Sequence, residues 1–128
     1  MVLGNKECFA NLPAENIDRA KKFYQQKLGL TLIKEFKEPG QESLVFQAGN
    51  NTKIFIYKRE KTKADHTALA FVVEDVEKVM AELKNNGVKF EVYPGMTDKK
   101  GLGQTGDMKY AWFKDSEGNI ICVGNHPF

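Results

Sequence analysis

The sequence repeats one pattern twice, and this repeat limits the folds that the chain can adopt. Residues 15–30 begin Glu-Asn-Ile-Asp-Arg-Ala and end Leu-Gly-Leu, and residues 74–88 begin Glu-Asp-Val-Glu-Lys-Val and end Gly-Val. Asn16 matches Asp75 at an offset of 59 residues, and a slip of one residue aligns Gly29 with Gly87. A repeat of this length is a supersecondary unit. Two copies fill the chain, and we expect a functional cleft between them.

Each copy is predicted to contain a strand, a helix and three more strands. In the first copy, Asn16 can cap a helix whose apolar stripe ends at Gly29. In the second, Asp75 caps and Gly87 ends the corresponding helix. The eight expected strands cover residues 8–12 (ended by Pro13), 30–36, 43–47, 53–57, 67–73, 88–93, 109–114 and 119–123. This order indicates an α+β chain without a Rossmann unit.

Length and composition exclude several classes of protein. The 128 residues predict a single domain over 1–128, with modules at about 5–60 and 64–124. The net charge of +2 comes from well-mixed charges, so we expect no nucleic-acid partner. We expect no membrane partner either, because no apolar run approaches the roughly 18 residues of a membrane span. The first residues lack a signal-peptide pattern, which favours a cytoplasmic location. Cys8 and Cys122 are interpreted as reduced thiols.

Three motifs resemble those of the glyoxalase/bleomycin-resistance/extradiol-dioxygenase superfamily, also called vicinal oxygen chelate. They are Asn16-Ile17-Asp18-Arg19-Ala20-x-x-Phe23-Tyr24 with Leu28-Gly29-Leu30, Phe71-x-Val73-x-Asp75-Val76, and Phe113-x-Asp115-x-x-Gly118-Asn119-x-Ile121. In the third, Ser116 stands where the family usually has proline. The resemblance implies two βαβββ modules that form a U-shaped mixed sheet around a cleft. It also implies a homodimer, which would cover the exposed sheet edges.

The resemblance further implies four metal-ligand positions, usually His or Glu in metal-dependent members. Here they hold Phe9, Phe55, Ala68 and Cys122. Phenylalanine and alanine donate no lone pairs, and one thiolate cannot complete a coordination shell. We therefore expect no metal and no cofactor, and a cleft that is apolar and aromatic at its base.

Other residues are candidates for the cleft by strand alternation. His66 lies two residues before Ala68 and could bind a ligand or act as a base; we favour the alternative of an exposed histidine beside Asp65. Cys122 could be a reactive thiol, although its apolar neighbours favour a small buried hydrophobe. Asn11 shares the face of Phe9 and could bind a ligand or only cap the strand end. The aromatic candidates are Tyr57, Tyr93, Tyr110 and Trp112, where core packing and ligand stacking are equally good explanations.

Two functional hypotheses follow from these residues. The first is a metal-free protein that binds a small, partly aromatic or apolar molecule in the cleft. The second is a glyoxalase-like lyase or isomerase that acts on a small oxygenated substrate, with His66 as a weak catalytic candidate. The glycine-bearing loop at 94–107 could be a lid over the cleft or a merely mobile surface loop.

Overall fold

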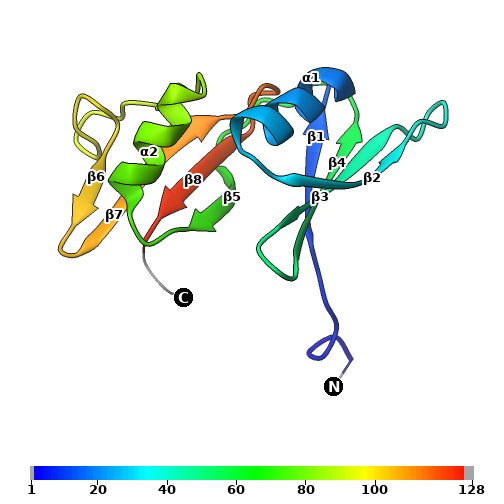
Figure 1. Ribbon diagram of the computed structural model, residues 1–128, viewed down its shortest axis with the longest axis horizontal. Coiled ribbons are helices and arrows are strands. Elements are labelled where there is room, and N and C mark those ends of the chain that lie inside the picture. The colour runs from blue at the N-terminus through cyan, green and yellow to red at the C-terminus, as the bar shows by residue number, and fades with distance from the viewer. Residues whose placement is uncertain (1, 126–128) are drawn as a thin grey trace.

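The computed structural model describes residues 2–125, which form two four-stranded sheets with helices packed on them (Figure 1). In the first module, helix α1 continues directly into a π-helical turn, η1. The elements of this module are β1 (Ala10–Ala14), α1 (Ile17–Lys22), η1 (Phe23–Lys27), β2 (Thr31–Phe36), β3 (Ser43–Ala48) and β4 (Thr52–Lys58).

The second module has the same strand order as the first. Its elements are β5 (Thr67–Val72), α2 (Val76–Asn85), β6 (Gly103–Thr105), β7 (Met108–Lys114) and β8 (Ile120–Gly124). The sheet orders are β1-β4-β3-β2 and β5-β8-β7-β6. In the first sheet β1 runs parallel to β4, and in the second β5 runs parallel to β8. The α+β class and the paired βαβββ modules predicted from the repeat are therefore confirmed.

Both helices begin as their capping residues predict. The side chain of Asn16 accepts a hydrogen bond from the Arg19 backbone N–H at 3.0 Å, and Asp75 accepts one from Lys78 at 3.0 Å. The first helix differs from a regular α-helix in its second half, where the Leu28 N–H donates to the carbonyl of Phe23. Phe23 and Tyr24 lie three and four residues after the buried Ala20, so both face the core.

Two predicted strands differ from those observed. The first strand does not stop at Pro13 but includes it, because β1 is an edge strand and can lack one backbone donor. The predicted strand at 88–93 is wrong: Phe90 forms only an isolated bridge with Phe113, and the place beside the rest of β7 is taken by β6. Two short segments thus share one edge of β7.

One hydrophobic core joins the two modules. Phe23 of the first module lies against Phe113 of the second, with ring centroids 6.4 Å apart, and Tyr24 packs on Phe46 at 5.6 Å. The Tyr24 hydroxyl donates to the buried carboxylate of Asp115 at 2.5 Å. Asp115 also accepts from the backbone of Glu117 and Asn119, which closes the turn between β7 and β8.

The helix ends meet across the internal repeat. The Asn86 side chain donates to the backbone carbonyl of Lys27 at 3.1 Å, and these residues are separated by 59 positions, the same offset as the repeat itself. Nearly equivalent positions of the two modules therefore touch each other. No helix within residues 2–125 is both long and apolar enough to cross a membrane.

Candidate functional site

The outer face of the first sheet carries a row of aromatic side chains. Strand alternation turns Leu12 of β1 and Ile54 of β4 into the core and leaves Phe9, Asn11, Phe55 and Tyr57 on the opposite side. The rings of Phe9 and Phe55 are 6.3 Å apart, and those of Phe55 and Tyr57 are stacked at 6.4 Å. Phe9 is 54% exposed, so this row is open to solvent.

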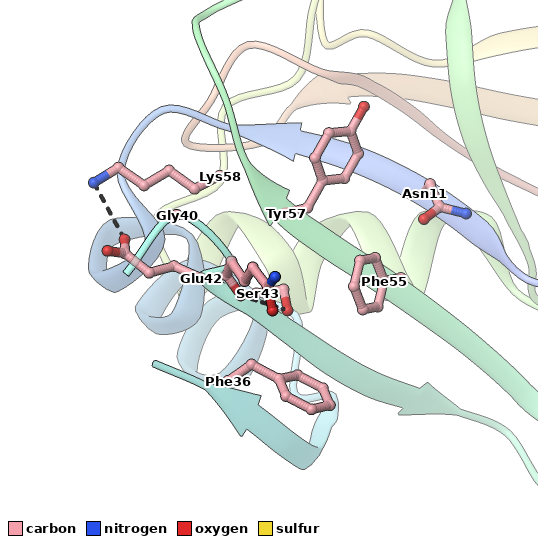
Figure 2. A pocket seen from close by; sticks show the side chains of 9 residues that line it. Asn11, Phe36, Gly40, Glu42, Ser43, Phe55, Tyr57 and Lys58 are labelled. Atoms are coloured by element: carbon pink, nitrogen blue, oxygen red, sulfur yellow. Dashed lines mark hydrogen bonds and ion pairs between the residues drawn. The ribbon is translucent and has the colours of Figure 1, made fainter. Parts of the chain in front are cut away.

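A pocket of about 610 Å³ lies beside this row (Figure 2). Phe55 and Tyr57 from β4 and Asn11 from β1 form one part of its lining, and Phe36 from β2 forms another. Ser43 places a buried hydroxyl in the lining. Lys58 and Glu42 form an ion pair at 3.1 Å at one end. The pocket therefore offers aromatic surface with a few polar groups, which is the usual character of a small-molecule site.

The outer face of the second sheet is covered by a tryptophan. Trp112 of β7 pairs with Cys122 of β8. Its indole N–H donates to the Thr67 hydroxyl on β5 at 3.1 Å, so the side chain reaches across β8. Tyr110 lies against Trp112 with centroids 5.3 Å apart. Ala68, on the neighbouring edge strand, is exposed at a break in the ladder between Thr67 and Leu69.

Cys122 is a poor candidate for a nucleophile. Its side chain is only 7% exposed, and burial raises the pKa of the thiol. A thiol of raised pKa is mostly protonated at neutral pH and is a weak nucleophile. This environment supports the interpretation of Cys122 as a small buried hydrophobe.

A second pocket, of about 290 Å³, lies on this face of the second sheet. His66 and Thr67 line it together with Tyr93, Met96 and Trp112. The Nδ1 atom of His66 is 2.7 Å from Asp65, and both side chains are largely exposed, at 78% and 86%. This exposed position beside Asp65 agrees with the interpretation of His66 as a surface histidine. The two residues nevertheless line the second pocket.

The predicted cleft residues thus come together in two groups. Asn11, Phe55 and Tyr57 line the first pocket, and His66 and Trp112 line the second, but the two pockets share no residue. The repeat is preserved in the pairing of the strands on these faces. Asn11 of the first module pairs with Phe55, and Ala70, the residue equivalent to Asn11 in the second module, pairs with Cys122.

Sequence reasoning missed several lining residues, among them Phe36, Ser43 and Met96. Phe36 and Ser43 are partners in the β2–β3 ladder and reach the first pocket from the far end of the sheet. The hairpin signal at Pro39-Gly40 could have indicated that pairing. Met96 belongs to the 94–107 segment and reaches the second pocket only through the tertiary path of that segment.

The 94–107 segment is fixed by its own hydrogen bonds. The Asp98 carboxylate accepts from the backbone N–H groups of Lys100 and Leu102 at 2.8 and 2.9 Å. A Cβ atom on Gly103 would lie 2.2 Å from the ring of Tyr110. The segment therefore packs closely onto β7 rather than forming a loosely attached surface loop.

The side chains present do not fit a divalent metal. Of the four positions implied by the family resemblance, only Cys122 has a donor atom, and its thiol is buried. Within residues 2–125, no three His, Cys, Asp or Glu side chains gather in a way that could hold a metal ion. This donor set does not match the coordination that Zn²⁺ or Ni²⁺ requires.

Comparison with known proteins identifies the family. The model of the glyoxalase/bleomycin resistance protein/dioxygenase superfamily matches residues 9–123. The chain therefore belongs to this superfamily, as the three sequence motifs predicted. No curated protein matches it.

Solved structures agree on the fold. A glyoxalase family protein from Enterococcus faecalis is 25% identical, with a TM-score of 0.72 over 94% of this chain and 98% of that chain. Lactoylglutathione lyase from Agrobacterium tumefaciens is 18% identical, with a TM-score of 0.69 over 95% of each chain. A genomically encoded fosfomycin resistance protein from Listeria monocytogenes is 14% identical, with a TM-score of 0.72 over 100% of this chain and 94% of that one.

Proposed function

We propose that this protein binds a small, partly aromatic or apolar molecule on the outer face of its first sheet. The observation that carries the proposal is the open row of Phe9, Phe55 and Tyr57 beside a pocket of about 610 Å³. Aromatic side chains left partly exposed in a concave site provide stacking surface for a flat ligand. Asn11 and Ser43 supply polar groups that can orient that ligand.

Binding is proposed to occur without a divalent metal. The support for this is the chemistry of the four ligand positions, where Phe9, Phe55 and Ala68 have no donor atom. Elemental analysis of protein purified without chelator should give clearly less than one Ni, Zn, Mn or Fe per chain. A stoichiometric metal that changes the melting temperature when it is removed would contradict this part of the proposal.

We further propose that the protein works as a homodimer. The edge strands β1 and β5 each have one ladder partner, and β5 itself exposes Val72 at 58%. The two pockets lie apart in one chain, and a second copy could place a second-sheet face opposite a first-sheet face. Sedimentation should give about twice the chain mass of 14.5 kDa. A monomer at high micromolar concentration would refute the dimer.

A thermal-shift screen of planar aromatic compounds tests the binding proposal. A ligand at about 100 times its Kd should raise the free energy of unfolding by about 2.7 kcal/mol. Phe55→Ala should abolish that increase, because it removes the ring at the centre of the row. Val92→Ala is a matched control, since this side chain is 48% exposed and lies outside the pocket. Equal shifts in both variants would place the ligand elsewhere.

A glyoxalase-like lyase or isomerase is the second candidate. The observation that favours it is the His66–Asp65 pair at 2.7 Å on the rim of the second pocket, since a carboxylate can orient an imidazole for proton transfer. If this candidate is right, turnover of a small oxygenated substrate should be lost in His66→Gln. Unchanged turnover in that variant would exclude His66 as the base.

A further inference from the structure

The pocket on the second sheet has a composition that differs from the first. Tyr93, Met96 and Trp112 form an apolar wall, and the carboxylate of Asp65 lies on the rim. The pocket is open to solvent, and its volume of about 290 Å³ is less than half that of the first pocket. All of these residues belong to one chain, so the pocket exists without a partner subunit.

Two aromatic rings meet nearly at a right angle in this wall. The centroids of Tyr93 and Trp112 are 5.5 Å apart, and the angle between the ring planes is 79°. Trp112 is held in place by its hydrogen bond to Thr67 and by contact with Tyr110 on its other side. Rings that form a corner can direct the negative potential of two π systems at one ligand atom. Met96 adds a soft, polarisable thioether.

The charge around the pocket favours a cation. No Lys or Arg is among the lining residues. The hydrogen bond from His66 lowers the pKa of Asp65, so the carboxylate is ionised at neutral pH. Glu91 also acts on Tyr93: burial and then the Glu91 charge raise the pKa of that phenol. Lys114 lies 3.7 Å from Glu91 and offsets part of its charge, which leaves Asp65 as the principal anion.

We propose that this pocket binds the alkylated ammonium group of an organic cation. Tyr93 and Trp112 contact the cation through their ring faces, Met96 contacts its alkyl groups, and Asp65 provides the counter-charge. The inference deepens the proposed function and rests on it in one respect, namely that the protein's ligand is a small molecule held on the sheet faces. It assigns the second pocket a ligand chemistry that the first pocket lacks.

Trp112 provides a direct readout, because it is the only tryptophan in the sequence. Its fluorescence is followed while choline is added at about pH 8, where carboxylates are ionised and imidazoles are generally neutral. The comparison ligand is the uncharged alcohol in which carbon replaces the nitrogen of choline. Sodium chloride at equal concentration controls for ionic strength. Choline should change the emission with half-saturation at about 1 mM or below, and the alcohol should need at least tenfold more, about 1.4 kcal/mol weaker.

Two variants test the named residues. Asp65→Asn and Tyr93→Leu should each raise the half-saturation concentration of choline about three- to tenfold. Asp65 is 86% exposed, so its replacement does not endanger folding. Asp107→Asn is the matched control, because it makes the same chemical change at an exposed site outside the pocket and should leave binding unchanged.

Three results would overturn the inference. The first is the absence of a saturable change in emission when choline reaches about ten times the expected half-saturation concentration. The second is equal binding of choline and its uncharged analogue. The third is equal binding of choline by wild type and by Asp65→Asn. None of them bears on the first sheet, since Phe55→Ala and the aromatic screen report on that face separately. Conversely, choline binding that persists in Phe55→Ala would support the inference for the second pocket even if the aromatic screen finds no ligand for the first sheet.

Discussion

Glu117 joins the two modules, and its replacement by glutamine should weaken the fold. Its side chain is only 2% exposed and lies in the turn between β7 and β8. It accepts hydrogen bonds from the backbone N–H groups of Glu15 and Asn16 at 2.9 and 3.0 Å. Arg19 donates two more, at 2.7 and 2.9 Å. Glutamine has almost the same shape, but it turns one acceptor oxygen into a donor that faces these donors.

The size of the effect follows from the pKa of Glu117. Burial alone would raise this pKa, but the Arg19 side chain and the Asn16 backbone N–H outweigh burial and lower it from 4.5 to about 2. At about 1.4 kcal/mol per pH unit this corresponds to roughly 3 kcal/mol. Arg19 is 49% exposed, and solvent screening there reduces the expected contribution to about 2 kcal/mol.

The sign of the pH dependence is fixed by the direction of the shift. A carboxyl group with a lowered pKa in the folded state contributes its full stability above its unfolded-state pKa of about 4.5. This contribution is lost as the pH falls from about 5 towards 2, where the folded protein also takes up the proton. The difference between wild type and Glu117→Gln should therefore shrink over the same range.

Urea unfolding at neutral and acidic pH measures both effects. We expect Glu117→Gln to lower the free energy of unfolding by about 2 kcal/mol at neutral pH and by clearly less as the pH approaches 2. Glu77→Gln is the control, because Glu77 also pairs with a cation, Lys109, but is 57% exposed and should cost under about 0.5 kcal/mol. A loss in Glu117→Gln no larger than in Glu77→Gln, or one independent of pH, would refute the reasoning.

Two further substitutions test the packing that positions the two sheet faces. Tyr24→Phe should cost about 2 kcal/mol in urea unfolding, because the buried Asp115 carboxylate loses its 2.5 Å hydrogen bond; a loss below about 0.5 kcal/mol would show that this bond is unimportant. Gly103→Ala should cost about 1–3 kcal/mol, because its Cβ would lie 2.2 Å from the Tyr110 ring. A stability equal to that of the neighbouring exposed variant Gln104→Ala would contradict this contact.

The sequence predicted the features that depend on local chemistry. Asn16 and Asp75 cap their helices because their side chains bond the third backbone N–H of the same helix, which spacing alone reveals. Alternation likewise put Phe9, which directly precedes β1, and Phe55 of β4 on one face. The strand at 88–93 failed because its apolar residues pack on the core without a continuous ladder. Whether β6 or this segment pairs with β7 depends on the path of the chain between them.

The placement of the site could be predicted only in part. Alternation assigns each residue to a face, but the separation of the two faces depends on how the modules meet. That meeting is fixed by long-range contacts, such as Tyr24 with Asp115 and Glu117 with Arg19, which lie 91 and 98 residues apart in sequence. Periodicity in a single sequence carries no information about such pairs. The division of the candidate residues between two pockets was therefore outside its reach.

The internal repeat has produced two faces of different chemistry, and this difference leads to a last prediction. Phe55 and Cys122 occupy equivalent positions on β4 and β8, yet one belongs to an open aromatic row and the other is buried beside Trp112 in the register of the hairpin. If a homodimer places the two faces opposite each other, a molecule with an aromatic ring at one end and an alkylated ammonium group at the other can use both.

Joining the two groups makes the second contact intramolecular, so affinity should exceed that of either fragment by about a hundredfold or more. Calorimetry with the two fragments and the joined molecule measures this gain. Phe55→Ala should reduce the joined molecule to about the affinity of its ammonium fragment, and Asp65→Asn should weaken it by the same three- to tenfold factor as choline. A joined molecule that binds no better than its stronger fragment, in a protein shown to be a dimer, would mean that the two faces do not meet and that each pocket serves its own ligand.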